Sequence, residues 1–375
     1  MKSEKLLNEE LLNMQKEKGK ICVSIIVPTH RLSPERRVDE PEVKKALENA
    51  RQFLRFKYEE SEIKPLLQAL DELYKNIDFN HNSDGLGLYV SPNIKLLVQF
   101  PFPVQEKVMV GDNFELRDLI YKMNYSKPYF ALLLTEKEVR LFEGSLDKLK
   151  EIKDGNFPKK YEEEFIYNPP SRGTPSGHAH VRNFEKDKSA LEEIRFKDFF
   201  RNTDELLNDY LVNNIPLILL GTEKELGWFR DISVHKKQII DEINGSYNNS
   251  YPTEVAKIVW PLMQSHLDSE TVKLIKEFIE KIGEHRGISG IQDVWQAARE
   301  GRGLKLLVEK DFRKPGFVAK DAYRLFLRPP QNSHKILADA VDDIIEMVLE
   351  KNGEVFFTYD DALKDFQRIA LITRY

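Results

Sequence analysis

Two histidines separated by one residue form the most chemically suggestive segment of this sequence. The pair is His178 and His180. Small and basic residues surround them: Arg172, Gly173, Gly177 and Arg182. An imidazole titrates near neutral pH, so either histidine can serve as a general base. Alternate residues of an extended segment can also converge on one metal ion, but no third ligand is evident nearby. The remaining interpretation is a solvated loop whose imidazoles meet water or RNA phosphate.

A second group of basic side chains follows the first apolar run of the chain. Its members are His30, Arg31, Arg36 and Arg37. The group lies between the end of a predicted strand and a predicted helix that begins at Pro41. Such a place suits a phosphate or an RNA backbone. The competing interpretation is a solvated loop whose charge is balanced by acidic neighbours, namely Glu35, Asp39 and Glu40.

Composition limits the classes of protein that this chain can belong to. It has 375 residues, 41% of them apolar, and a net charge of −5, which argues against a protein that coats duplex nucleic acid. A single cysteine, Cys22, cannot form an internal disulfide and lies in an apolar run typical of an inert core thiol. The first 20 residues lack the apolar core of a signal peptide, and no stretch is long enough to span a membrane. We expect a cytoplasmic protein.

The elements that must position these residues can be read from apolar periodicity. The first third predicts a buried strand at 21–27, helices from Pro41 and after Pro65, two paired strands at 86–90 and 94–100, and a helix at 115–121. The middle third predicts strands at 129–134 and 139–142. It then predicts a long loop at 156–188, a helix that begins at Ser189 with Glu192 completing a capping box, and a strand at 216–221.

The last third begins after a polar break at 244–250. It predicts a long helix from Asp268 and a second helix at 291–298. A glycine turn around Arg302 and a strand at 304–308 follow. A helix at 341–349 and strands at 355–357 and 369–372 close the chain. This mixture of helices and strands indicates an α/β (mixed α+β) fold class.

Four stretches in chain order carry a resemblance to a known family. They are the Gly-Asp-Asn-Phe turn at 111–114 with the hairpin after it, the loop and helix of the middle third, the glycine-rich segment 287–308, and the closing Arg374-Tyr375 pair. Together they resemble the archaeo-eukaryotic peptide-chain release factors and Pelota. The opening segment 24–31 and the turn at 82–86 are similar to a bacterial branch, bacterial archaeo-eukaryotic release factor family 3.

The resemblance implies a three-domain architecture. It comprises an N-terminal α/β domain at 1–127 and an RNase H-like middle domain at 128–265 that contains the loop 156–188. A C-terminal α/β sandwich at 266–375 resembles ribosomal kink-turn-binding proteins. The expected partners are the ribosome and tRNA or ribosomal RNA. A protein partner is also expected through the C-terminal domain, where Arg302 would contact that protein or ribosomal RNA, although a helix C-cap explains Gly301 equally well. We expect no membrane partner, cofactor or metal.

Two motifs of the family are missing from this chain. Family members hydrolyse peptidyl-tRNA through a Gly-Gly-Gln loop, but no glutamine lies between Gln105 and Gln238. An Asn-Ile-Lys-Ser element reads stop codons, but here Leu96 follows Asn93, Ile94 and Lys95. We therefore expect a ribosome-associated factor for rescue, hibernation or a stress response, with neither stop-codon decoding nor Gly-Gly-Gln hydrolysis. The alternative is a hydrolase of peptidyl-tRNA or another ester that uses His178 and His180.

Overall fold

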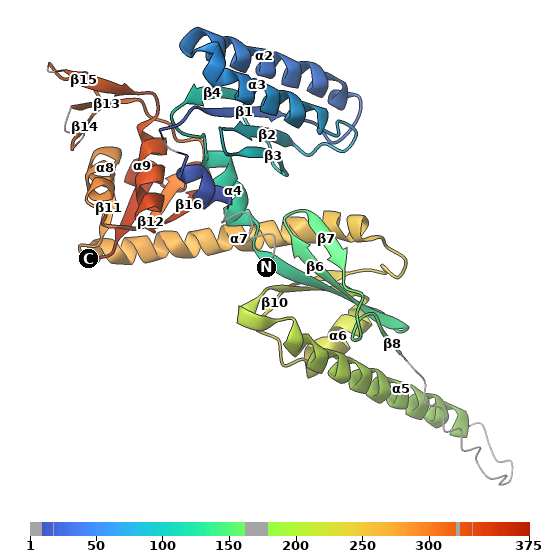
Figure 1. Cartoon of the computed structure of the whole chain (residues 1–375). Coiled ribbons are helices and arrows are strands. Elements are labelled where there is room, and N and C mark those ends of the chain that lie inside the picture. Colours follow the sequence, from blue (N-terminus) through green and yellow to red (C-terminus); the bar gives the residue numbers. More distant parts are fainter. Residues whose placement is uncertain (1–9, 18, 162–178, 320–322, 332) are drawn as a thin grey trace. The chain divides into compact units, whose positions relative to one another are not determined.

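The structure is a computed structural model of the chain and describes residues 10–17, 19–161, 179–319, 323–331 and 333–375. Within the long helix that begins at residue 179, side chains are described from residue 193 onward. The chain divides into two compact units (Figure 1). The first combines Met1–Ser126 with Leu267–Tyr375, and the second is Lys127–His266.

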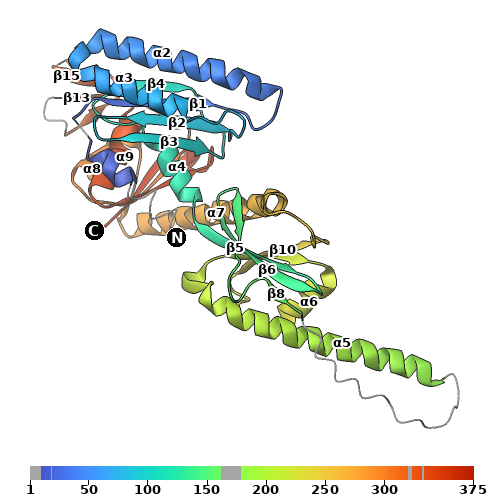
Figure 2. The same cartoon turned by 45° about the vertical axis from the view of Figure 1, so that its right-hand side comes forward.

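The N-terminal segment of the first unit is an antiparallel sheet with two helices on one face (Figure 2). Its strand order is β3-β2-β1-β4, and a helix α4 follows the last strand. The elements are β1 (Cys22–Pro28), η1 (Glu35–Val38), α2 (Asp39–Lys57), α3 (Glu60–Lys75), β2 (Gly85–Val90), β3 (Lys95–Phe100), β4 (Lys107–Gly111) and α4 (Arg117–Tyr125).

Strand β1 is apolar at nearly every position, with Ser24 as a buried exception, because both faces of this sheet are buried. Val23, Ile25 and Val27 pack with α2 and α3, while Cys22 and Ile26 belong to the core on the opposite face. A strand covered on both faces reads as a continuous apolar run rather than an alternating one.

The C-terminal segment of the first unit is a mixed sheet between helices. Its order is β11-β17-β12-β16, in which β12 and β16 run parallel. Along β12, Leu306 and Val308 join the core on the side of α8 and α9, whereas Leu307 packs with Phe278 of α7. The elements are α7 (Pro252–Gly283), β11 (Gly287–Ser289), α8 (Ile291–Arg299), β12 (Gly303–Glu309), α9 (Ala340–Glu350), β16 (Glu354–Thr358), η4 (Lys364–Phe366) and β17 (Ile369–Thr373).

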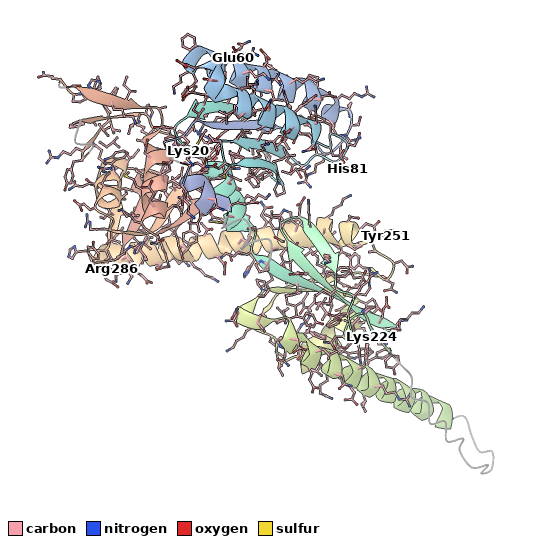
Figure 3. The ribbon with its side chains drawn as sticks, in the orientation of Figure 1. Lys20, Glu60, His81, Lys224, Tyr251 and Arg286 are labelled. Carbon is pink, nitrogen blue, oxygen red and sulfur yellow. The ribbon has the colours of Figure 1, made fainter. Side chains whose placement is uncertain are left out.

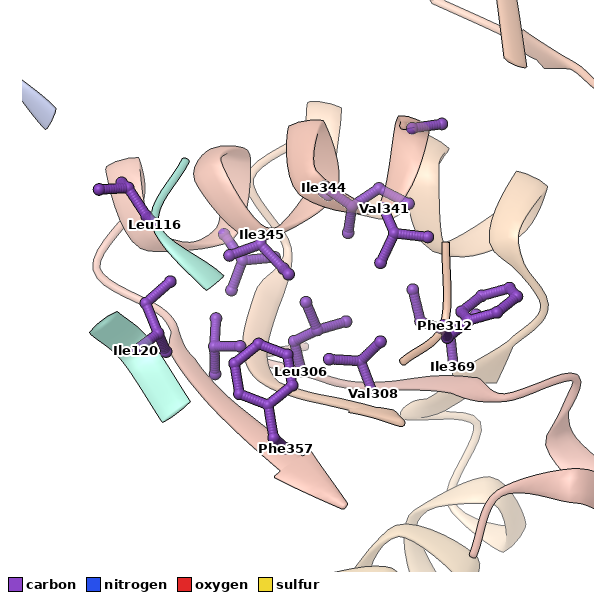
Figure 4. Close-up of a cluster of buried hydrophobic side chains, with 14 of the residues drawn as sticks. Leu116, Ile120, Leu306, Val308, Phe312, Val341, Ile344, Ile345, Phe357 and Ile369 are labelled. Carbon is purple, nitrogen blue, oxygen red and sulfur yellow. The ribbon is translucent and has the colours of Figure 1, made fainter. Parts of the chain in front are cut away.

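The two segments of the first unit share a hydrophobic core. Figure 4 shows Leu116 and Ile120, from the N-terminal segment, beside Ile345 and Phe357, from the C-terminal segment. All four side chains are 6% exposed or less. Because residues more than 200 positions apart exclude water together, folding of the N-terminal and C-terminal segments is expected to be coupled.

The second unit is built on a mixed sheet of order β10-β9-β5-β6-β7, with β8 also paired to β6. Strands β5, β9 and β10 run parallel, and β6 and β7 are antiparallel to their neighbours. The mixed sheet expected for the middle segment is therefore present. Its strands are β5 (Pro128–Leu134), β6 (Glu138–Ser145), β7 (Lys148–Glu151), β8 (Lys159–Lys160), β9 (Leu217–Gly221) and β10 (Ile239–Asn244).

Helices α5 (Ala179–Leu206) and α6 (Glu223–Ile232) pack on this sheet, and two short helices, η2 (Leu207–Asp209) and η3 (Val212–Asn214), follow α5. Phe196, Phe199 and Phe200 of α5 lie in the core. The helix start predicted at Ser189 is wrong, because α5 begins ten residues earlier, at Ala179. The loop predicted for 156–188 is therefore interrupted by β8 and by the first turns of α5. A capping box does occur in this unit, but between Thr222 and Glu225 at the start of α6.

The start predicted for the first helix of the last third is also wrong. Helix α7 begins at Pro252 rather than at Asp268, and it runs across the limit between the two units. Pro261 lies inside α7, although proline removes one helical hydrogen bond. The limits of the units, after Ser126 and after His266, each lie one residue from a predicted boundary. The three-domain division and the RNase H-like and kink-turn-binding-protein-like assignments stay predictions.

A third, three-stranded sheet belongs to the first unit, and its order is β14-β13-β15. The strands are β13 (Gly316–Ala319), β14 (Leu325–Phe326) and β15 (His334–Leu337). Apolar periodicity did not predict this sheet. Among the helices that the structure describes, none is long and apolar enough to cross a membrane.

Candidate functional site

The histidine-containing segment lies largely beyond the described residues. Arg172, Gly173, Gly177 and His178 are outside them, and the side chains of His180 and Arg182 are outside them as well. The backbone of His180 belongs to the first turn of α5. The described residues therefore test neither the general-base nor the metal interpretation of the two histidines, and the general-base role of both stays a prediction.

A groove of about 660 Å³ opens where the chain leaves the sheet of the second unit toward residue 162. Basic and amide side chains gather in its wall: Asn156, Lys159, Lys160, Arg195 and Asn202. Tyr161 also lines the groove, and its ring stacks on Phe196 with 4.7 Å between the ring centres. Asp198 is the one acidic residue in the described lining. Cationic and amide donors of this kind suit the oxygen atoms of a phosphate backbone.

The basic loop after β1 is organised around a buried carboxylate. Asp39 is fully buried at the start of α2. Its Oδ1 lies 2.7 Å from Nδ1 of His30, and its Oδ2 accepts hydrogen bonds from the backbone N–H of His30 and from the amide of Asn82. The imidazole of His30 remains 42% exposed. Asp39 therefore orients the ring, while the far side of the ring faces outward.

Two of the predicted phosphate ligands hold the loop itself. Arg31 donates two hydrogen bonds to Asp84, with 2.8 Å for each pair of atoms. Arg36 donates to the backbone carbonyls of Arg31 and Asn80. These contacts tie the loop to the turn before β2, where Figure 3 labels His81. Arg37 is exposed and has no side-chain partner among the described residues. His30 and Arg37 are thus the members of this group that remain directed toward solvent.

Arg302 lies in the turn between α8 and β12. Gly301 has a φ of +73°, and the backbone N–H of Arg302 donates to the carbonyl of Ala297, as expected at a helix C-terminus. The guanidinium of Arg302 lies 2.9 Å from the carboxylate of Glu300 and is about one third exposed. The helix-cap interpretation of Gly301 is therefore confirmed, while the RNA-contacting role of Arg302 stays a prediction.

The residues that match part of the codon-reading motif have a local structural role. Asn93 donates to the Glu17 carboxylate at 3.0 Å, and Lys95 begins β3. Burial by itself would raise the pKa of Glu17, but hydrogen bonds from Lys20, Asn93 and Ser91 outweigh it and lower the pKa to about 2. This carboxylate therefore fastens the N-terminal turn to the loop before β3.

Cys22 is not placed for chemistry. The side chain is fully buried, and this burial raises the pKa of its thiol to about 12. It is therefore protonated at neutral pH, as expected of an inert core thiol. Among the described residues, no group of three or more histidine, cysteine or acidic side chains could hold a metal ion.

Sequence reasoning missed the partners that decide how these basic residues act. Asp39 was interpreted as balancing the charge of a loop, yet it is the buried anchor of His30. Asp84 and Asn82 were noted only in a turn, 43 or more residues from their partners. A signal did exist for Asp39, because an acidic residue at a predicted helix start is well placed to accept hydrogen bonds.

The middle of the chain matches a known protein family. The model of bacterial archaeo-eukaryotic release factor family 3 matches residues 128–302, which include the whole second unit except Lys127 and continue through α8. No curated protein matches the sequence.

Several solved structures are similar at low identity. Pelota of Archaeoglobus fulgidus has 14% identity and a TM-score of 0.39, over 78% of this chain and 84% of that one. A ribosome-bound archaeal Pelota has 10% identity and a TM-score of 0.38, over 98% and 94% of the two chains. The archaeal translation termination factor aRF1 has 13% identity and a TM-score of 0.25, over 99% and 98%. The resemblance that the sequence motifs predicted is confirmed over residues 128–302, where the chain matches bacterial archaeo-eukaryotic release factor family 3.

Proposed function

We propose that this protein is a ribosome-associated translation factor of the release factor and Pelota type. It would act in the cytoplasm, in ribosome rescue, hibernation or a stress response. The observation that carries the proposal is the match of residues 128–302 to the family model. A similar archaeal Pelota is described as ribosome-bound, which supports the choice of partner.

The charge distribution of the described residues agrees with local rather than general RNA binding. The net charge of the whole chain is −5. Cations are nevertheless concentrated in the groove lined by Lys159, Lys160 and Arg195, and at Arg37 beside His30. A factor that docks at a few places needs only such local patches, because each phosphate contact releases its own counterions.

The proposal excludes the hydrolytic step used by the family. No glutamine lies between Gln105 and Gln238, so the side chain that would position water is missing from the loop. His178 and His180 are the residues of this segment that could replace it in proton transfer. We propose binding without turnover and treat hydrolysis as an outcome of the test.

Sedimentation through a sucrose gradient tests the binding directly. The purified protein is mixed with 70S ribosomes and with separated subunits from a bacterium, and pellet fractions are quantified. We expect co-sedimentation that is lost in the charge-reversal variant Lys159→Glu, Lys160→Glu, Arg195→Glu. A matched control reverses three exposed charges of the first unit, Arg55→Glu, Lys64→Glu and Lys75→Glu, and should still sediment with ribosomes. A wild-type protein that stays at the top of the gradient contradicts the proposal.

A release assay separates the binder from the hydrolase. Ribosomes that carry labelled peptidyl-tRNA are incubated with the wild type and with the double variant His178→Ala, His180→Ala. We expect no release of peptide above background for either protein. Release by the wild type that disappears in the double variant would establish the hydrolase instead.

A further inference from the structure

The small sheet β14-β13-β15 has one face in the core of the first unit and one face turned away from it. Val318, Leu325 and Leu337 are 5% exposed or less and belong to the core that contains α8 and α9. The amide of Gln292, on α8, donates to the carbonyl of Leu325 at 3.0 Å. Figure 1 shows the sheet at one edge of this unit, beside α8 and α9. The backbone of the sheet is therefore held firmly from its inner side.

The outer face is aromatic and apolar. Phe317 on β13 is paired with Phe326 on β14 and with Ile336 on β15, and residues paired in this way project from the same face. The ring of His334 meets the ring of Phe317 edge-on, with 5.3 Å between their centres. Ile336 is 68% exposed, so no described segment covers it. Phe317 and Phe326 are half-buried and project from this partly exposed face. Aromatic rings at such a place can stack with a planar group.

The residues around this face are basic. The segment 313–337 contains six Lys or Arg residues and one acidic residue, Asp321, although the whole chain has a net charge of −5. The cations among its described residues are Arg313, Lys314, Arg324, Arg328 and Lys335. Arg313 lies 3.8 Å from Asp339, whereas Lys314, Arg328 and Lys335 are exposed and have no side-chain partner among the described residues. A concentration of unpaired cations in an acidic protein indicates an anionic partner.

We propose that the outer face of β14-β13-β15 is a binding platform for single-stranded RNA, on which bases stack against Phe317 and Phe326 while Lys314 and Arg328 contact phosphates. Every base has an aromatic face, and antiparallel sheets that display aromatic side chains next to cations are a recurrent solution for unpaired RNA. A protein partner of acidic charge would use the cations, but it would gain nothing specific from two paired aromatic rings.

The proposal deepens the function proposed above by naming a class of RNA and a place for it. It rests on that function only for the origin of the RNA, which on a ribosome would be an unpaired loop or strand. The platform and the groove in the second unit share no residue. Binding of an isolated oligonucleotide therefore tests the platform even if the protein does not associate with ribosomes. Failure of the RNA platform can thus be distinguished from failure of the proposed function.

The experiment measures fluorescence anisotropy of a fluorescein-labelled single-stranded uridine 12-mer titrated with the full-length protein. A 12-base-pair RNA duplex is the second probe. We expect saturable binding of the single strand and weaker binding of the duplex, whose bases are already stacked. The variant Phe317→Leu, Phe326→Leu keeps both positions apolar and removes the rings. Its affinity for the single strand should fall at least about fivefold, given the usual contribution of one stacked base.

Rescue and charge variants separate stacking from a general loss of structure. The variant Phe317→Tyr, Phe326→Tyr retains aromatic faces and should bind the single strand within about twofold of the wild type. The variant Lys314→Glu, Arg328→Glu should bind more weakly and with a flatter dependence on salt, because about 0.7 counterions per phosphate contact are released on a single strand. Its control is Arg55→Glu, Lys64→Glu, which changes the net charge equally at exposed positions on α2 and α3.

Several results would overturn the platform. Equal affinity of the wild type and the Leu variant would show that the rings do not stack on bases. Equal affinity for the charge-reversed variant and its control would show that these cations do not contact phosphate. Retained ribosome sedimentation together with no oligonucleotide binding would leave the proposed function standing and remove the RNA platform, with an acidic protein surface as the replacement occupant.

Discussion

The guanidinium of Arg117 donates to the carboxylate of Asp342, with 2.9 Å between Nε and Oδ1, across 225 residues of sequence. The same guanidinium donates to Asp339 and to the carbonyls of Lys310 and Phe312. Arg117 is only 2% exposed. One residue at the start of α4 therefore satisfies four groups of the C-terminal segment, and it does so beside the shared hydrophobic core.

Replacing Arg117 by alanine should strongly destabilise the first unit. The change leaves Asp339 and Asp342 without their buried partner, and breaking a buried ion pair in this way costs about 3 kcal/mol or more. Urea denaturation followed by circular dichroism measures the loss, and hydrogen exchange should locate it in α4 and α9. Arg313→Ala is the control, because Arg313 is 3.8 Å from Asp339 and one third exposed. Equal stability of the two variants would contradict the role given to Arg117.

The buried carboxylate of Asp39 should contribute more to stability than the neighbouring exposed carboxylates do. Asp39→Asn keeps the size of the side chain but turns an acceptor of three hydrogen bonds into a group that must donate toward His30 or Asn82. The expected loss of unfolding free energy is about 2 kcal/mol, together with faster proteolysis of the loop between residues 29 and 38. Glu40→Gln, at the adjacent exposed position, should leave both the melting temperature and the proteolysis rate unchanged. Identical proteolysis of the two variants would show that Asp39 does not hold the loop.

The stability of the N-terminal turn should depend on pH through Glu17. The folded-state pKa of about 2 lies below the ordinary value of 4.5, so the carboxylate stabilises the folded state above pH 4.5. That contribution is lost as the pH falls from 4.5 toward 2. Melting temperatures of the wild type and Glu17→Gln should therefore differ at pH 7 and converge as the pH is lowered to 3. The control is Glu62→Gln, at an exposed position on α3, whose difference in melting temperature from the wild type should not change with pH. A pH-independent difference for Glu17→Gln as well would refute this assignment.

Two glycine substitutions should have different effects on the free energy of unfolding. Gly301 has a φ of +73°, so Gly301→Ala places a side chain in the left-handed region at a cost of about 1 kcal/mol. Gly283, at the end of α7, has open space around the position of a new Cβ. Gly283→Ala should therefore be neutral or stabilising, by up to about 1 kcal/mol. Thermal denaturation measures both changes, and a destabilising Gly283→Ala would mean that this glycine has a role that its surroundings do not show.

Many elements were predictable from local pattern. The run around Cys22 became β1, the apolar face from Val43 became α2, and the strand near Leu306 became β12, because burial of a face imposes a period on the sequence itself. Prediction was wrong where the sequence contains local signals that packing overrides. Ser189 and Glu192 match a capping box, yet they lie inside α5. The long helix of the last third was predicted to begin at Asp268, yet α7 begins at Pro252, directly after the polar break at 244–250.

The sequence by itself determined the mixed α/β class, the family resemblance that residues 128–302 confirm, the missing glutamine and the basic loop after β1. Only the tertiary structure decided how those basic residues are used, since Asp39 binds Asn82 and Arg31 binds Asp84 across 43 and 53 positions. It also decided that Arg117 joins the two ends of the chain and that Phe317, Phe326 and Ile336 share one sheet face. The physical reason is that periodicity records whether a side chain is buried, whereas charge pairing and cross-strand register depend on segments that meet only after the chain has folded.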